Sequence, residues 1–183
     1  MQSNWIKQPA ILTGEKVQLV PLERKHVDEL LPLTKDKSLW QFFPKDYSVE
    51  KIFFDSIDEM ITGRENGTHY PFITIYKPSQ KIIGSTMLFD LNQFDKRLEI
   101  GRTWLIKDFR GGGINTECKK LLLKFCFEEL RCVRVQFKAT ETNLRSRKAI
   151  EKIGGKLEGV IRKERLMENG TWRNAAIYSI LDD

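Results

Sequence analysis

The residues with the clearest chemical potential form the run Arg110-Gly111-Gly112-Gly113, which lies between an apolar stretch and an amphipathic one. Glycine tolerates positive φ and lets the backbone approach a ligand closely. The N-terminus of a helix presents unpaired N–H groups and a partial positive charge. Glycines that open a helix beside an arginine therefore predict a site for a phosphate or diphosphate group.

Other glycine-rich phosphate motifs fit this loop poorly. The Gly-Lys-Ser/Thr ending of a P-loop is absent. The dinucleotide-binding pattern is incomplete because Thr116 stands where its third glycine belongs, although Glu141 could imitate its ribose-binding acid. The alternative that needs no ligand is a tight turn between two elements, and spacing alone leaves it open.

The chain has few residues that could bind a metal or carry out thiol chemistry. It has 3 cysteines and 2 histidines, and no Cys-x-x-Cys pair. This argues against a disulfide framework and a zinc site, so no metal is expected. Cys118 and Cys126 fall in an apolar helical pattern, where a free cysteine acts as a small core residue.

Composition indicates an ordinary globular chain. Of 183 residues, 40% are hydrophobic and 31% charged, which predicts a single domain over residues 1–183 with residues 1–14 as a lead-in. No run is long enough for a membrane span and no signal peptide is visible, so a cytoplasmic location and no membrane partner are expected. The net charge of +6 favours anionic partners, but the basic residues are dispersed, which does not favour nucleic acid.

Periodicity places these features on secondary-structure elements. Apolar alternation predicts strands, and apolar spacing of three and four predicts helices. The expected strands are 17–22, 71–76, 81–91, 98–106, 133–139, 157–167 and 172–181, the last two joined by an Asn-Gly turn. The expected helices are 26–34, a helix capped by Ser48 that ends near Gly63, 114–130 and 144–153.

This order predicts an α+β fold. A mixed, mostly antiparallel twisted sheet of about seven strands should be flanked by about four helices. The connection from Leu98 to Ala139 is one strand–helix–strand crossover, which should be right-handed and should make its two strands parallel.

Three stretches carry a resemblance that covers about Ile11 to Leu181. They are Leu98-Glu-Ile-Gly-Arg-Thr-Trp-Leu105, Phe109-Arg-Gly-Gly-Gly-Ile-Asn-Thr-Glu117, and Asn143-Leu-Arg-Ser-Arg-Lys-Ala-Ile-Glu-Lys-Ile-Gly154 followed by Glu158-Gly159. Together they resemble the GNAT superfamily of acetyl-CoA-dependent N-acetyltransferases, and most closely its RimJ/RimL-like ribosomal-protein N-terminal acetyltransferase branch.

The resemblance implies acetyl-CoA as cosubstrate and an assignment of its contacts. The diphosphate motif is matched by Arg110, Gly113 and Asn115. The backbone before the loop should hold the pantetheine arm, and Asn143 should face the cosubstrate while it also caps the next helix. The full set of expected acetyl-CoA contacts is Thr103, Trp104, Leu105, Arg110, Gly111, Gly112, Gly113, Ile114, Asn115, Thr116, Asn143 and Ser146.

Two positions depart from the family pattern. Asn115 stands where a small residue is usual, so its side chain must point away from the phosphates or bond to them. Ile150 occupies the place of a tyrosine that can protonate the leaving thiolate. Ser146 becomes the candidate for that role, although it could equally be an exposed serine in the first turn of its helix. Arg147 and Lys148 could meet the 3′-phosphate or simply face solvent.

The resemblance also implies a base and an acceptor pocket. Glu99 is the candidate base, acting through water; the alternative is a carboxylate paired with Arg97 or Arg102. Trp40, Phe42, Phe43 and Trp104 are the candidate acceptor-binding residues, with His69 and Tyr70 secondary. An aromatic cluster of this kind is otherwise core.

We therefore expect an acetyltransferase that acts on a primary amine by direct attack, without a covalent enzyme intermediate. A protein or peptide N-terminus, for example of a ribosomal protein, is the first choice of acceptor. A small amine such as an aminoglycoside or polyamine is the second. A non-catalytic CoA-binding module on RNA or the ribosome is the alternative of a different class. A homodimer is left open.

Overall fold

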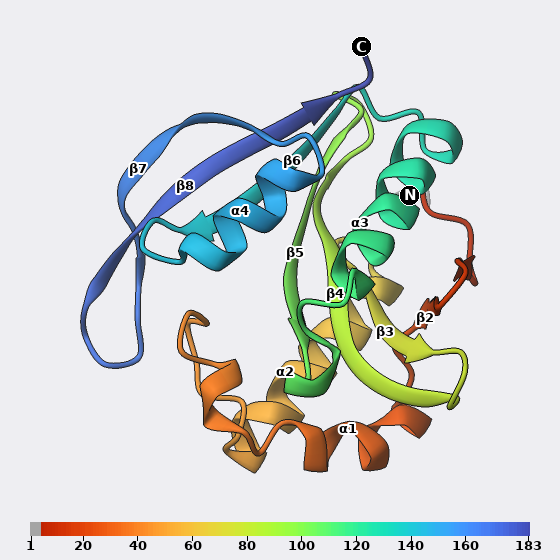
Figure 1. Ribbon diagram of the computed structural model, residues 1–183, viewed down its shortest axis with the longest axis vertical. Coiled ribbons are helices and arrows are strands. Elements are labelled where there is room, and N and C mark those ends of the chain that lie inside the picture. Colours follow the sequence, from red (N-terminus) through yellow and green to blue (C-terminus); the bar gives the residue numbers. More distant parts are fainter. Residues whose placement is uncertain (1–4) are drawn as a thin grey trace.

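One twisted sheet separates two layers of helices (Figure 1). The structure is a computed structural model that describes residues 5–183. The strand order in the sheet is β1-β2-β3-β4-β5-β6-β8-β7. The strands are β1 (Leu12–Thr13), β2 (Val17–Pro21), β3 (Tyr70–Tyr76), β4 (Lys81–Asn92), β5 (Arg97–Leu105), β6 (Arg134–Thr140), β7 (Lys156–Leu166) and β8 (Trp172–Leu181).

The helices cover both faces of this sheet. They are α1 (Val27–Leu33), α2 (Glu50–Glu65), α3 (Ile114–Lys124) and α4 (Leu144–Lys152). Helices α1 and α2 lie on one face, and α3 and α4 lie on the other (Figure 1). The expected α+β class is thus confirmed, with one more strand than anticipated. The missed strand, β1, has only two residues, too few for a periodic pattern.

Two helix boundaries differ from the prediction. Val49, not Ser48, is the N-cap of α2. The amide of Ser48 instead donates to Asp46 Oδ1 at 3.0 Å, which commits this residue to the preceding turn. Beyond α3, the α-helical repeat gives way to a π turn over Phe125–Glu129, so the predicted single helix to Leu130 is two pieces.

Strands β5 and β6 run parallel and then part. Their pairing covers three residues only, from Arg97↔Arg134 to Glu99↔Gln136. Figure 1 shows the two strands diverging from this end of the sheet. Beyond Glu99, this edge of β5 has no strand partner among residues 5–183, and the gap opens toward the loop that starts α3.

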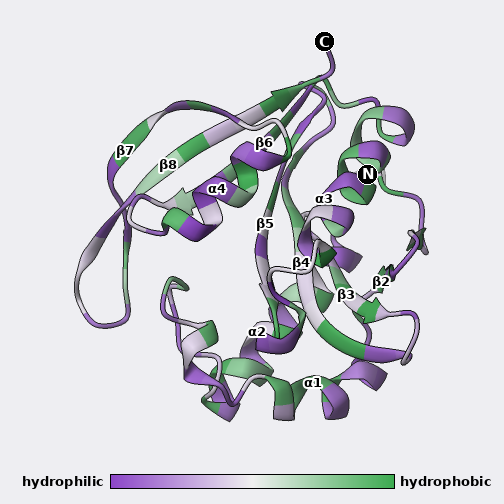
Figure 2. Cartoon of the chain, viewed as in Figure 1, coloured by the Kyte–Doolittle hydropathy of each residue, from purple (hydrophilic) through white to green (hydrophobic). Residues whose placement is uncertain are grey.

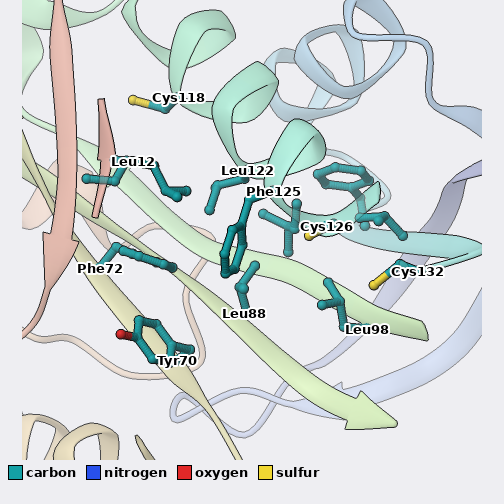
Figure 3. Close-up of a cluster of buried hydrophobic side chains, with 14 of the residues drawn as sticks. Leu12, Tyr70, Phe72, Leu88, Leu98, Cys118, Leu122, Phe125, Cys126 and Cys132 are labelled. Carbon is teal, nitrogen blue, oxygen red and sulfur yellow. The ribbon is translucent and has the colours of Figure 1, made fainter. Parts of the chain in front are cut away.

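The main core lies between the sheet and helices α3 and α4. Figure 3 shows Leu88 and Leu98 from the sheet gathering against Leu122 and Phe125. The helices are amphipathic, with apolar residues inward and polar residues outward (Figure 2). A smaller cluster, which includes Ile57, joins α1 and α2 to the opposite face. Among residues 5–183, no helix has the length and hydrophobicity needed to cross a bilayer.

Candidate active site

The glycine loop before α3 has the geometry that an anion site needs. Gly111 and Gly113 have φ of 84° and 85°, in the left-handed region that favours glycine. A Cβ built on Gly111, Gly112 or Gly113 would meet no atom within 4 Å, so the loop borders open space. No side chain hydrogen bond caps the start of α3 at Gly113, which leaves N–H groups of the first turn free to bind phosphate oxygens. This arrangement fits the diphosphate of CoA.

Arg110 stiffens the loop and adds positive charge to it. Its Nε donates to the Leu105 carbonyl at 2.8 Å, which ties the loop to the end of β5. Burial lowers the pKa of Arg110, and the nearby charge of Arg145 lowers it further, against an opposing effect of Asp36. A bound anion between two arginines would relieve their repulsion.

Asn115 lies inside the same first turn of α3. Its Oδ1 is buried and has no hydrogen-bond partner among the described residues. An acceptor oxygen cannot bond a phosphate oxygen, so it is the backbone of this turn, rather than that atom, that suits the anion.

A bulge in β5 faces the gap between the strands. Ser85 pairs with Trp104 and Met87 pairs with Gly101, so Arg102 and Thr103 together oppose the single residue Thr86. Arg102 has φ of 47°, as expected for the strained residue of a bulge. The bulge and the unpaired edge leave backbone groups of Thr103 and Trp104 able to bond an extended ligand in the manner of an added strand, whereas the Leu105 carbonyl is held by Arg110. The predicted pantetheine contacts thus stand at an open edge.

Three residues in and next to α4 that the sequence analysis singled out differ in their surroundings. The Oδ1 of Asn143 accepts from the Ser146 amide at 3.1 Å, which is the predicted N-cap. Ile150 is buried in the core, 7% exposed, and offers no proton. Arg147 is already engaged, since its Nε donates to Tyr178 Oη at 2.8 Å and its Nη1 to the Glu141 carbonyl.

Glu99 is a buried carboxylate on the face of β5 that is turned away from α3. Leu98 and Ile100 point into the core beneath α3, and Glu99 points to the other side. It is 2% exposed, and its Oε2 accepts from Gln136 Nε2 at 2.9 Å and from Lys138 Nζ at 3.0 Å. Burial raises the pKa of this carboxyl above its ordinary value, against the opposing effects of Gln136 and Lys138. A raised pKa moves a carboxylate toward the range of a useful general base.

The ion pair suggested for Glu99 from sequence is formed with a different residue. Arg97 pairs with Asp95, and Arg102 pairs with Glu59 on α2. Lys138 takes their place because parallel pairing sets β6 beside Glu99.

An aromatic pocket lies on the same face of the sheet as Glu99, between α1, α2 and β5. Trp40 contacts Phe43, Tyr47 and Trp104, with ring centroids 5.2, 5.1 and 5.4 Å apart. These rings line a cavity of about 40 Å³. Of the predicted acceptor residues, three are brought together here, while Phe42 is outside the lining and accepts a hydrogen bond from Arg173 at its carbonyl, 2.9 Å away.

The secondary acceptor candidates lie elsewhere. Tyr70 Oη accepts from the Ala10 amide at 2.8 Å. His69 packs against Gly63, close enough that a Cβ there would stand 2.3 Å from the imidazole ring. Both line a separate small cavity beside Trp5.

Sequence reasoning missed three residues of the site. Tyr47 and Arg102 complete the lining of the aromatic pocket. Lys119, on α3, is buried behind the bulge and donates to Thr86 and Thr103. The local pattern gave only a weak signal for Lys119, because several lysines lie on this amphipathic helix and its rotation against the sheet decides which one is buried. Within residues 5–183, no three metal-binding side chains come together.

Comparison with known proteins places this geometry in a family. The model of the acetyltransferase (GNAT) domain matches residues 16–156. The Bacillus subtilis (strain 168) protein YjcK, named as a probable N-acetyltransferase, is 27% identical over 177 residues, which is 94% of this chain and 97% of YjcK. YdaF of the same organism carries a provisional name as a ribosomal N-acetyltransferase; it is 37% identical over 100 residues, 55% of this chain and 54% of YdaF.

A solved structure supports the fold. The GCN5-related N-acetyltransferase from Brucella melitensis superposes with a TM-score of 0.86 at 24% identity, covering 96% of this chain and 80% of that one. GNAT acetyltransferases use acetyl-CoA. The loop, the bulge and the parted strands, together with the matched family model, show that the chain belongs to the GNAT family and is an acyltransferase.

Proposed function

We propose that the protein acetylates the N-terminal α-amine of a protein or peptide by direct attack on acetyl-CoA. The observation that carries this proposal is the lining of the aromatic pocket. Its charged residue is Arg102, and no carboxylate lines it among the described residues. A polyamine or aminoglycoside carries several positive charges and needs acidic partners, which this lining does not offer. The provisional ribosomal name of YdaF supports the same acceptor class.

The size of the pocket also suits a peptide. A cavity of about 40 Å³ lined by Trp40, Phe43 and Trp104 suits the side chain of a terminal residue.

Acetyl transfer then needs a neutral amine and donors for the developing oxyanion. A terminal α-amine has a pKa of about 8, and a lysine amine about 10.4, so less deprotonation is required of the former. Glu99, acting through water, accepts the proton as nitrogen attacks. Backbone N–H groups at the β5 bulge stand where they can bond the carbonyl oxygen. Acetyl-CoA supplies the acyl group, held by the glycine loop and the open edge of β5.

An acceptor panel tests this proposal. The panel contains peptides with a free N-terminus, the same peptides blocked at the N-terminus but with an internal lysine, spermidine and an aminoglycoside. Thiol release gives the rate, and mass spectrometry gives the position of the added acetyl group. We expect acetylation at the α-amine of the free peptides. Preferential acetylation of the lysine side chain or of the polyamines would overturn the assignment.

A further inference from the structure

Lys119 is a buried cation that the chemistry so far described does not use. Its residue is 6% exposed, on the side of α3 that faces the sheet. Nζ donates to Thr86 Oγ1 at 3.1 Å and to Thr103 Oγ1 at 2.5 Å. It also stands 5.9 Å from the ring centroid of Phe137 on β6. The ammonium therefore lies between β4, β5 and β6, where the parallel pair opens.

The charge of Lys119 has no anionic partner in the part of the chain that the structure describes. None of the ion pairs among residues 5–183 includes it. Two neutral hydroxyls and one ring face compensate a buried ammonium poorly. Leucine or methionine would pack at this position without that cost. A buried charge kept at such a cost is a candidate for a functional group.

The position of Lys119 relative to the cosubstrate follows from the helix. It is six residues beyond Gly113, which is about 9 Å along α3 from the diphosphate loop. Its partner Thr103 belongs to the bulge at the open edge of β5. A pantetheine arm that starts at the loop and extends along β5 would pass this bulge and hence pass Nζ, and the proposal below places its sulfur end there.

We propose that Lys119 is the acid that protonates the sulfur of departing CoA. The family position for a tyrosine donor holds the apolar Ile150, and Ser146 has only a weakly acidic hydroxyl. Lys119 supplies a permanent, directed N–H donor on the other wall of the gap, with Thr86 and Thr103 fixing its direction. The inference concerns the coenzyme end of the reaction and holds for any amine acceptor.

The proton and electron balance of the step is complete. The amine nitrogen forms a bond to the acyl carbon, and Glu99, through water, takes the proton that the nitrogen loses. The carbon–sulfur bond breaks with its electron pair on sulfur. Lys119 gives one Nζ proton to that sulfur and becomes a neutral amine. After CoA leaves, Lys119 regains a proton from water and Glu99 releases one, so the net products are the amide and free CoA thiol.

The acidity of Lys119 suits this role. Burial lowers its pKa from 10.5 to about 8, with smaller opposing effects of Cys118 and Cys126. An ordinary thiol has a pKa of about 8.5, so donor and acceptor are closely matched. The groups that face Nζ from β4, β5 and β6 are Thr86, Thr103 and Phe137, which do not titrate. Glu99 and Lys138 point to the opposite face of the sheet.

A titration of bound CoA tests the proposal without any acceptor amine. The ultraviolet absorbance of the thiolate is followed against pH in the wild type, Lys119→Met and the matched control Lys120→Met, whose lysine is exposed one residue along α3. We expect the wild type and the control to raise the thiolate fraction of bound CoA about tenfold over free CoA near neutral pH. Lys119→Met should abolish this increase, while its affinity for desulfo-CoA, which lacks the sulfur, stays the same.

The pH dependence of kcat provides the second readout, measured with the best acceptor of the panel. An acceptor amine gains reactivity as pH rises, so a fall in kcat above about pH 8 reports loss of an acid in the enzyme. Lys119→Met should lower kcat by about tenfold or more and remove this fall. Thr86→Val keeps the lysine but removes one acceptor from it, and should move the fall to lower pH.

Two results would overturn the assignment. One is a bound thiol that titrates alike in the wild type and in Lys119→Met. The other is a basic limb that is unchanged in Thr86→Val, which decides the matter even if the methionine variant folds poorly. In either case Ser146 or water is the donor. Because the titration uses no amine, failure here is distinct from failure of the α-amine proposal.

Discussion

The two faces of β5 hold their buried charges in opposite ways. On the acceptor side, Glu99 has a lysine and an amide within hydrogen-bond distance. On the coenzyme side, the partners of Lys119 within residues 5–183 are two hydroxyls and the ring face of Phe137, none of them charged. A paired charge is tolerable in the resting protein, whereas an unpaired one is stabilised only when an anion arrives or forms. If Lys119 is the acid proposed above, the difference means that the coenzyme face is the incomplete one and is completed by negative charge that appears during the reaction.

The largest expected effect comes from the acceptor face. Glu99→Gln should lower kcat/KM by about a hundredfold or more, because the amide cannot accept the proton of the amine. Wild-type activity should also fall as the pH drops through the raised pKa of Glu99, since a protonated carboxyl is no base. A pH–rate profile checks both effects. Glu128→Gln, an exposed site on the π turn, is the control, and an acidic limb that survives in Glu99→Gln would remove Glu99 from the reaction.

On the coenzyme face, the buried charge of Lys119 should lower the stability of the folded protein. Lys119→Met should raise the free energy of unfolding by on the order of 2 kcal/mol at neutral pH, because it removes a fully buried ammonium. The folded pKa of about 8 lies below the unfolded value of 10.5, so the wild type should gain stability as pH rises between these values. Urea unfolding at several pH values measures this. A variant less stable than the wild type at pH 7 would mean that Lys119 contributes to the fold.

A substitution in the aromatic pocket should change KM for the acceptor peptide but not KM for acetyl-CoA. Trp104→Leu should raise KM for the peptide about tenfold, because it removes a ring that shapes the cavity, and should leave KM for acetyl-CoA nearly unchanged. Phe42→Leu is the matched control outside the lining. Initial rates with each substrate varied in turn separate the two constants. An equal rise in both would place Trp104 at the coenzyme instead.

The smallest effect is expected in the glycine loop. Gly113→Ala forces an L-residue to φ of 85° and should cost about 1 kcal/mol, with acetyl-CoA affinity falling about fivefold as the first turn of α3 shifts. Gly112→Ala lies in the same loop without a positive φ and should change the affinity less. Calorimetry with acetyl-CoA compares the two. Equal effects would show that contact with the ligand, not backbone conformation, selects glycine here.

How much could be predicted differs between the two faces. The glycine loop, its helix and the crossover could be predicted because their residues are contiguous in the chain and because glycines before a helix indicate a particular local backbone conformation. The α+β class followed from the same local periodicity. Contacts between residues on different strands could not be predicted from the sequence. Lys138 reaches Glu99 only because parallel pairing places β6 beside β5, and the local sequence offered Arg97 and Arg102 as nearer partners.

Lys119 illustrates the second limit. Its sequence context is an amphipathic helix with several lysines, so burial of one of them depends on how α3 is rotated against the sheet. The two threonines that accept hydrogen bonds from it lie on separate strands, and one belongs to a bulge that no pattern of alternation predicts. Tyr47 was missed for a similar reason, because the loop that holds it has no periodicity.

The short pairing between β5 and β6 has a consequence for the order of events. Three residue pairs join β5 and β6, so the two parts of the sheet are held together at only one end of the line where these strands meet, which we call the seam. An extended cosubstrate that bonded along this seam would continue the sheet, and its binding would hold the two parts of the sheet together. The acyl donor should therefore enter before the acceptor and leave after the product, and the loaded protein should withstand heat better than the empty one by mass action.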